Sequence, residues 1–150
     1  MTRVHFDTTT AAPISRRAVE WQEACGADGV ARILVIDDDA RVRRFIVNVL
    51  TAAEHETLEA RDGLEGLSQF LIHRPNLVIL DLFMPVADGI ETIRALRDAA
   101  PGVQIVAISG SGASQEMVFL DLAKKLGADA ALAKPFAAAD LLKAVGRVLA

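Results

Sequence analysis

The sequence has few of the features that mark secreted or membrane proteins. Its single cysteine, Cys25, has no partner for an internal disulfide. No apolar run approaches the roughly 20 residues that cross a bilayer, and residues 1–13 lack the apolar stretch of a signal peptide. We therefore expect a cytoplasmic protein with no membrane partner.

Basic charge is also scarce. The 150 residues include 16 Lys and Arg against 20 Asp and Glu, which gives a formal net charge of -4. Nucleic-acid-binding domains usually need a basic field that attracts phosphates, so we expect no nucleic-acid partner. Proteins, or small anions bound through a metal ion, are the partners expected instead.

The chain is predicted to have two parts, an N-terminal extension at residues 1–29 and one domain at residues 30–150. The extension starts with a polar, threonine-rich leader that we expect to be disordered. The segment 12–25 then has apolar residues at helical spacing, namely Ile14, Ala18, Trp21 and Cys25. This spacing predicts a short amphipathic helix, which either packs on the domain through Trp21, the favoured role, or binds a partner.

From Arg32 onward, strand-like and helix-like patterns alternate. The predicted strands are 32–37, 56–60, 76–81, 103–108 and 129–133. The predicted helices are 40–53, 63–73, 88–99, 113–126 and 137–149. Regular alternation of this kind favours right-handed crossovers and a parallel sheet covered on both faces. The fold class expected is α/β, a doubly wound five-stranded parallel sheet with strand order 2-1-3-4-5.

Acidic residues follow two of the apolar strand segments. Asp37, Asp38 and Asp39 come directly after ILVI, and Asp81 comes after LVIL. Adjacent strands lie about 4.8 Å apart, so Asp81 should approach the first two carboxylates. Three ionised carboxylates about 5 Å apart would repel by about 3 kcal/mol per pair at an effective dielectric of about 20. A cation is therefore needed there, and Mg²⁺ suits a site made only of oxygen ligands. Asp39 should instead cap the helix that follows.

Two more polar residues end apolar runs at the same predicted edge. Ser109 precedes the turn Gly110-Ser111-Gly112, and Lys134 precedes Pro135. Each alone is more typical of a solvated loop. Together, a hydroxyl, an ammonium and a divalent cation near one carboxylate would neutralise the charge that develops when that carboxylate attacks a phosphoryl group. The combination predicts a metal and phosphoryl site.

With these motifs, residues 32–149 resemble the receiver domain of bacterial two-component response regulators. The motifs are, in order, ILVIDDD, LVILDLFMPVADGIE, IVAISGSG and AKPF. The resemblance implies the flavodoxin-like receiver fold. It also implies that Asp81 is the phosphoacceptor, forming a 4-aspartylphosphate, that Ser109 and Lys134 contact the phosphoryl group, and that the Lys134-Pro135 peptide is cis.

The resemblance also implies a metal and partners. Mg²⁺ would be bound by Asp38, Asp81 and the Phe83 backbone carbonyl directly, and by Asp37 through water. The phosphoryl donor would be a phosphohistidine on a sensor histidine kinase or a histidine phosphotransfer protein. The chain would act as a stand-alone phosphoacceptor in a phosphorelay rather than as an enzyme, with an unidentified protein target. A homodimer that forms on phosphorylation stays open.

The first helix of the domain is the expected docking site for the donor. Its residues near the active edge are Arg41, Val42, Phe45 and Ile46. The next two arginines, Arg43 and Arg44, are assigned to a solvated face and given no role. The fourth helix, fifth strand and fifth helix are left for output or self-association.

One position departs from the receiver pattern. The aromatic residue that often acts as a rotameric switch in the fifth strand is replaced by Ala131, and the chain has no Tyr. Phe119 or Phe136 could substitute for it. The segment between Ser109 and Lys134 is also a few residues longer than in short receivers.

Two other classes of protein share part of this pattern. A Mg²⁺-dependent phosphatase of the dehalogenase type would use an Asp nucleophile and a second acid two residues later, a spacing that Asp37 and Asp39 have. That assignment leaves Asp81 without a role. A flavin-binding module would need aromatic residues to stack on the ring near the crevice, and the sequence offers none there.

Overall fold

In the computed structural model, the described residues are 30–84, 89–110, 118 and 121–150. The strands are β1 (Arg32–Ile36), β2 (Glu56–Ala60), β3 (Leu77–Asp81), β4 (Gln104–Ser109) and β5 (Ala130–Ala133). The helices are α2 (Ala40–Ala52), α3 (Gly63–His73), α4 (Gly89–Ala99) and α6 (Ala138–Leu149). Residues 121–125 are also helical.

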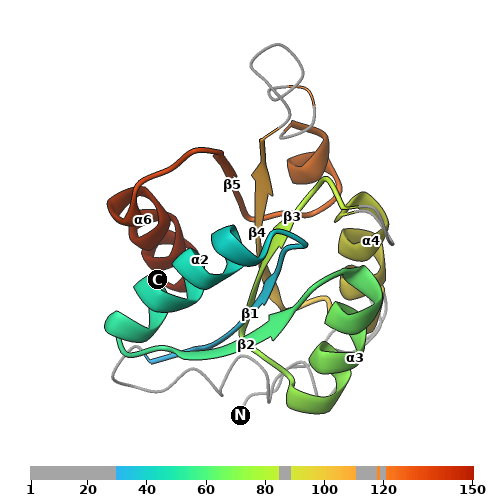
Figure 1. The fold of residues 1–150 in the computed structure, drawn as a ribbon. Helices are drawn as coiled ribbons and strands as arrows, with labels where there is room; N and C mark the ends of the chain where they lie inside the picture. Colours follow the sequence, from blue (N-terminus) through green and yellow to red (C-terminus); the bar gives the residue numbers. More distant parts are fainter. Residues whose placement is uncertain (1–29, 85–88, 111–117, 119–120) are drawn as a thin grey trace.

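The strands form one parallel sheet in the order β2-β1-β3-β4-β5. Helices α2 and α6 cover one face and α3 and α4 cover the other (Figure 1). Strand order and layering confirm the predicted doubly wound α/β fold. The chain adds β2 on one side of β1 and β3 on the other, and this change in the winding order puts a crevice at the carboxyl ends of β1 and β3, where such sheets bind ligands.

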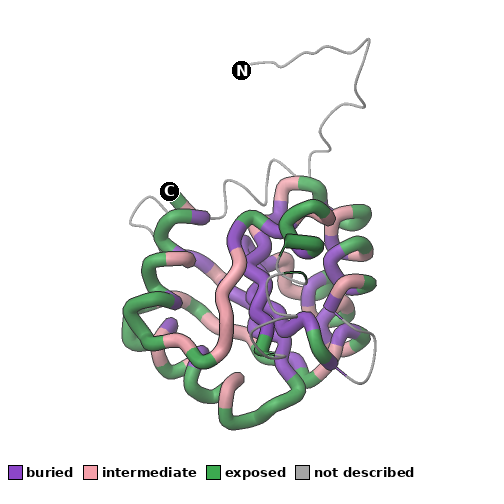
Figure 2. The backbone as a smooth tube through the Cα atoms, turned by 90° about the horizontal axis from the view of Figure 1, so that it is seen from above, coloured by how far each residue is buried: buried purple, intermediate pink, exposed green. Residues whose placement is uncertain are grey.

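The sheet separates two buried apolar clusters. Alternate residues of each strand face opposite sides, so Leu34 and Leu80 pack toward Phe70 of α3, whereas Val35 and Ile79 belong to the cluster on the α2 and α6 side. Figure 2 shows the buried residues gathered in the interior and the exposed ones around them. A sheet buried on both faces leaves only its edges for polar chemistry.

Acidic side chains cap the first turns of two helices and so fix where these helices begin. Asp39 is the N-cap of α2, and its carboxylate accepts hydrogen bonds from the N–H groups of Arg41, at 2.9 Å, and Val42, at 3.4 Å. This confirms the capping role predicted for Asp39. At α3, Asp62 accepts from the Glu65 N–H at 2.8 Å. Among the described residues, no helix is both long and apolar enough to cross a membrane.

Seven of the nine predicted ranges that fall on described residues differ from the observed ones by one residue at one or both ends, whereas 56–60 and 63–73 match. The predicted strand 32–37 ends one residue early, because the Asp37 carbonyl accepts from the Arg43 side chain instead of from a strand. The predicted strand 103–108 extends to Ser109, whose carbonyl accepts from the Lys134 N–H at 2.7 Å. The other shifted ranges are 40–53, 76–81, 88–99, 129–133 and 137–149. The leader, the helix predicted at 12–25, and most of the one at 113–126 lie outside the described residues.

Candidate functional site

The strand register brings the predicted polar residues to one edge of the sheet. Ile36 pairs with Leu80, and Ser109 pairs with Ala133. Asp37 therefore leaves β1 beside the end of β3, where Asp81 is the last residue. Ser109 ends β4, and Lys134 follows β5 directly. All four lie at the carboxyl ends of adjacent parallel strands.

Three carboxylates meet at this edge. Asp37, Asp38 and Asp81 each have an oxygen within 4.8 Å of the others. Asp37 and Asp81 are buried, at 1% and 4% exposure, while Asp38 is exposed. The Asp81 Oδ1 accepts a hydrogen bond from the Phe83 N–H at 3.1 Å, which leaves Oδ2 toward Lys134.

Lys134 bridges the two buried carboxylates. Its Nζ lies 3.1 Å from Asp37 Oδ2 and 3.3 Å from Asp81 Oδ2. The backbone of Gly110 makes room for this side chain, since a Cβ at Gly110 would lie 3.0 Å from Lys134 Cβ and Cδ. The predicted meeting of Lys134 with the acidic edge is observed, and the Lys134-Pro135 peptide is cis as expected.

Burial and mutual repulsion disturb the ionisation of these groups. Burial raises the pKa of Asp37 above its usual value, and the Lys134 charge only partly offsets it. Burial also raises the pKa of Asp81, with a further increase from the nearby Asp37 charge. For Lys134, burial acts to lower the pKa, but the attraction of Asp81 and Asp37 outweighs it, so the pKa of Lys134 is raised. Both buried carboxyl groups of this crowded edge therefore have raised pKa values, as burial and like charge dictate.

Ser109 supplies a hydroxyl without a partner. It is fully buried, and its Oγ makes no hydrogen bond with any other described residue. A buried polar group left unpaired costs about 1–3 kcal/mol. The predicted place of Ser109 at the end of the fourth strand is observed, and its burial excludes the solvated loop position that is more typical of a lone Ser before Gly. An incoming oxygen ligand would satisfy this hydroxyl.

The acidic cluster fits a hard divalent cation. Its donors are all oxygens, and a single ammonium balances only one of three carboxylates when all are ionised. Oxygen-only sites with residual negative charge are those that Mg²⁺ occupies. Asp37, Asp38 and Asp81 could hold such an ion. The additional ligand role expected for the Phe83 carbonyl stays a prediction.

Sequence reasoning missed two residues that shape this edge. Arg43, assigned to a solvated face, has a side chain only 15% exposed and donates from Nη1 to the Asp37 carbonyl at 2.7 Å. Arg43 precedes the buried residues Ile46 and Leu50 by three and seven positions, so helical spacing could have indicated its inward direction. Gly89 was also missed, and a Cβ there would lie 2.5 Å from the Asp81 carbonyl oxygen.

A groove opens beside Lys134 between α2 and the start of α6. It encloses about 510 Å³ and is lined by Arg41, Val42, Phe45, Gly110, Lys134, Pro135 and Phe136. The rings of Phe45 and Phe136 lie 6.0 Å apart between centroids. Phe45 is 39% exposed. The groove therefore presents apolar surface next to the acidic edge.

A second groove runs along the edge strand β5 and α6. It encloses about 290 Å³, and its lining includes Lys124, Ala131, Phe136, Lys143 and Arg147. The small side chain of Ala131 stands where an aromatic switch was expected. Phe136 lines both grooves. Phe119, the other candidate for the switch, lies outside the described residues.

Comparison with known proteins identifies the family. Residues 33–146 match the family model of the response regulator receiver domain. The chain is 38% identical over 112 residues to the response regulator MprA of Mycobacterium sp. (strain KMS), covering 74% of this chain and 47% of MprA. The chain spans about half the length of the curated relatives it matches.

Solved structures agree with this assignment. The chemotaxis protein CheY4 of Vibrio cholerae aligns with a TM-score of 0.71 and 31% identity, covering 79% of this chain and 98% of that one. NtrX of Brucella abortus aligns with a TM-score of 0.76 and 30% identity over 80% of this chain and 27% of its own. The chain belongs to the response regulator receiver domain family of two-component systems. Receiver domains bind Mg²⁺ at an acidic pocket, which the carboxylate cluster matches.

Proposed function

We propose that this chain accepts a phosphoryl group on Asp81 from a phosphohistidine, on a sensor histidine kinase or a histidine phosphotransfer protein. The observation that carries the proposal is the meeting of Asp81 with Asp37, Asp38, Lys134 and the unpaired Ser109 hydroxyl at one sheet edge. This set combines a nucleophile, a cation site and two groups that can contact phosphoryl oxygens.

Each side chain has a task in the transfer. A carboxylate oxygen of Asp81 forms a bond to phosphorus while the bond from phosphorus to the donor imidazole breaks, and the imidazole keeps the electron pair and takes a proton. Lys134, already 3.3 Å from Asp81 Oδ2, would follow the charge onto the phosphoryl oxygens. The Ser109 hydroxyl would donate to one of them. A bound Mg²⁺ would supply further neutralisation of the phosphoryl charge.

The groove beside Lys134 is proposed as the docking surface for the donor. Val42, Phe45 and Phe136 provide apolar contact area, and Arg41 provides a positive charge at the rim. A partner helix with apolar residues around its phosphohistidine would fit this lining. Phe45 is exposed in the free chain, so docking would bury it.

Output through a protein contact completes the proposal. Charged and small residues line the groove along β5, and Phe136 lines both this groove and the one beside Lys134. An unidentified protein target or a second copy of the chain would bind there after phosphorylation. The absence of a nucleic-acid partner stays a prediction from the net charge.

A hydrolase of the dehalogenase type is less well supported. It would need Asp39 as the acid partner of Asp37, but the Asp39 carboxylate accepts hydrogen bonds from the first turn of α2 instead. A phosphoacceptor is expected to keep its phosphoryl group, whereas a hydrolase releases it after each turnover.

Mass spectrometry separates these two functions. Incubation with acetyl phosphate and Mg²⁺ should add one phosphoryl group to the wild-type chain and none to Asp81→Asn. Asp39→Ser serves as a matched control and should be modified like wild type. Steady hydrolysis of p-nitrophenyl phosphate without a lasting mass gain would support the hydrolase instead.

A further inference from the structure

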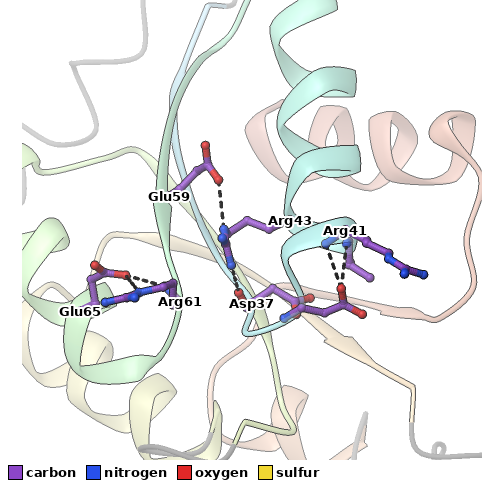
Figure 3. A network of polar contacts seen from close by, with 8 residues as sticks. Asp37, Arg41, Arg43, Glu59, Arg61 and Glu65 are labelled. Atoms are coloured by element: carbon purple, nitrogen blue, oxygen red, sulfur yellow. Dashed lines mark hydrogen bonds and ion pairs between the residues drawn. The ribbon is translucent and has the colours of Figure 1, made fainter.

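The backbone of Asp37 is bound by a side chain that the proposed chemistry does not use. Arg43, near the start of α2, donates from Nη1 to the Asp37 carbonyl oxygen at 2.7 Å. Its Nε donates to Glu59 Oε1 in β2 at 3.0 Å. Figure 3 shows the guanidinium between these two acceptors. Arg43 thus connects α2, β2 and the turn that carries the acidic residues.

Asp37 is fixed on three sides. Its N–H donates to the Ala60 carbonyl at 3.1 Å, its Oδ1 accepts from the Asp39 N–H at 2.8 Å, and its carbonyl accepts from Arg43. The bond from Arg43 is charge-assisted, and such bonds are roughly twice as strong as neutral ones. Together the three contacts set the direction in which Asp37 and then Asp38 leave the sheet.

We propose that Arg43 is a positioning residue for the metal site. By binding the Asp37 carbonyl while attached to Glu59, it fixes the peptide between Asp37 and Asp38, so that their carboxylates meet Asp81. The inference rests on the proposed Mg²⁺ site. Mg²⁺ demands near-ideal octahedral geometry, so a small displacement of these ligands weakens binding.

Charge alone predicts the opposite effect. Arg43 is a cation bound to the turn that carries Asp37 and Asp38, and removing it would make the site more attractive to another cation if only Coulomb's law mattered. A positioning role predicts weaker metal binding when Arg43 is lost. The sign of the change in Mg²⁺ affinity therefore separates the two roles.

The experiment is a calorimetric Mg²⁺ titration of the whole chain and its variants. Arg43→Ala should lower Mg²⁺ affinity about tenfold or more, since partners behind the ligands typically contribute about 10- to 100-fold. Arg43→Lys should recover part of it, because an ammonium can donate to the carbonyl but cannot also reach Glu59 in the same fork. The matched control is Arg44→Ala, because Arg44 is the exposed neighbour on the same helix. That variant should bind Mg²⁺ as well as wild type or slightly better.

Urea unfolding in a chelator shows whether each variant is folded before titration. An Arg43→Ala affinity equal to or above wild type would overturn the positioning role, as would an equal loss in Arg44→Ala. If Arg43→Ala does not fold, Arg43→Lys and Glu59→Gln decide: reduced affinity in both supports the role, and wild-type affinity in either overturns it. A wild-type chain that binds no Mg²⁺ would remove the metal site itself, and the inference with it.

Discussion

At the scale of single residues, Asp81 has two requirements that conflict in the metal-free protein. As a nucleophile it must be ionised, yet burial and the charge of Asp37 raise its pKa. Lys134 relieves part of this conflict through its contact with Asp81 Oδ2. Burying these ionisable groups lowers the stability of the folded protein, but it places them together for phosphoryl transfer. Such a conflict is common for buried charged groups at functional sites.

The Asp81→Asn variant should be more stable than wild type without metal. The folded-state pKa of Asp81 is raised, so the stability linked to its protonated form is present at low pH and lost as pH rises through that pKa. The wild type loses this stability as its carboxyl group ionises with rising pH, whereas Asn never carries the charge. Urea unfolding in a chelator should show a higher free energy of unfolding for Asp81→Asn.

Addition of Mg²⁺ should reverse that order. A ligand at 100 times its Kd stabilises the folded state by about 2.7 kcal/mol, and Asp81→Asn lacks one of the proposed ligands. Wild type should therefore gain more than the variant. Equal gains would show that Asp81 does not share the metal site.

His55 should make stability depend on pH away from the site. Burial lowers the pKa of His55 from 6.5, and its Nδ1 accepts from the Ala31 N–H at 3.1 Å, which requires the neutral ring. The unfolded chain therefore takes up the proton first, and stability falls as pH drops below about 6.5. His55→Asn keeps an acceptor and does not titrate. Its free energy of unfolding should fall less than that of wild type between about pH 7 and about pH 5, and identical slopes would exclude this contribution.

At the scale of elements, the start of α2 has two separate functions. Asp39 caps the helix with its carboxylate, while Arg43, one turn later, reaches back to the Asp37 carbonyl. The cap contributes to stability, and Arg43 acts on the direction of the acidic turn. The two functions can be separated by substitution.

Asp39→Ala should destabilise the chain by about 1 kcal/mol, the usual cost of losing an N-cap. Asp39→Ser keeps a capping oxygen and should recover most of that loss. Thermal unfolding measures the first effect, and a Mg²⁺ titration of Asp39→Ser should give an affinity close to wild type. A large loss of Mg²⁺ affinity in Asp39→Ser would place the Asp39 carboxylate in the metal site after all.

At the scale of the whole molecule, the parallel sheet explains which features were predictable. Apolar runs that stop at Asp81, Ser109 and Lys134 mark strand ends, and parallel strands bring their carboxyl ends together, so the site followed from the sequence. The inward direction of the Arg43 side chain was missed because its neighbour Arg44 is also an arginine. The two side chains differ only in the direction in which they leave the helix. The close approach of Gly89 to Asp81 depends on tertiary packing, which spacing alone does not reveal.

The central claim, that Asp81 accepts the phosphoryl group, is tested most directly by locating the modification. After treatment with acetyl phosphate and Mg²⁺, borohydride reduces an acyl phosphate to an alcohol, which marks the modified residue for peptide mass spectrometry. The mark is expected at Asp81 in the wild-type chain, with none at Asp37, Asp38 or Asp39. A mark on one of those three residues, or on no carboxylate at all, would contradict the claim.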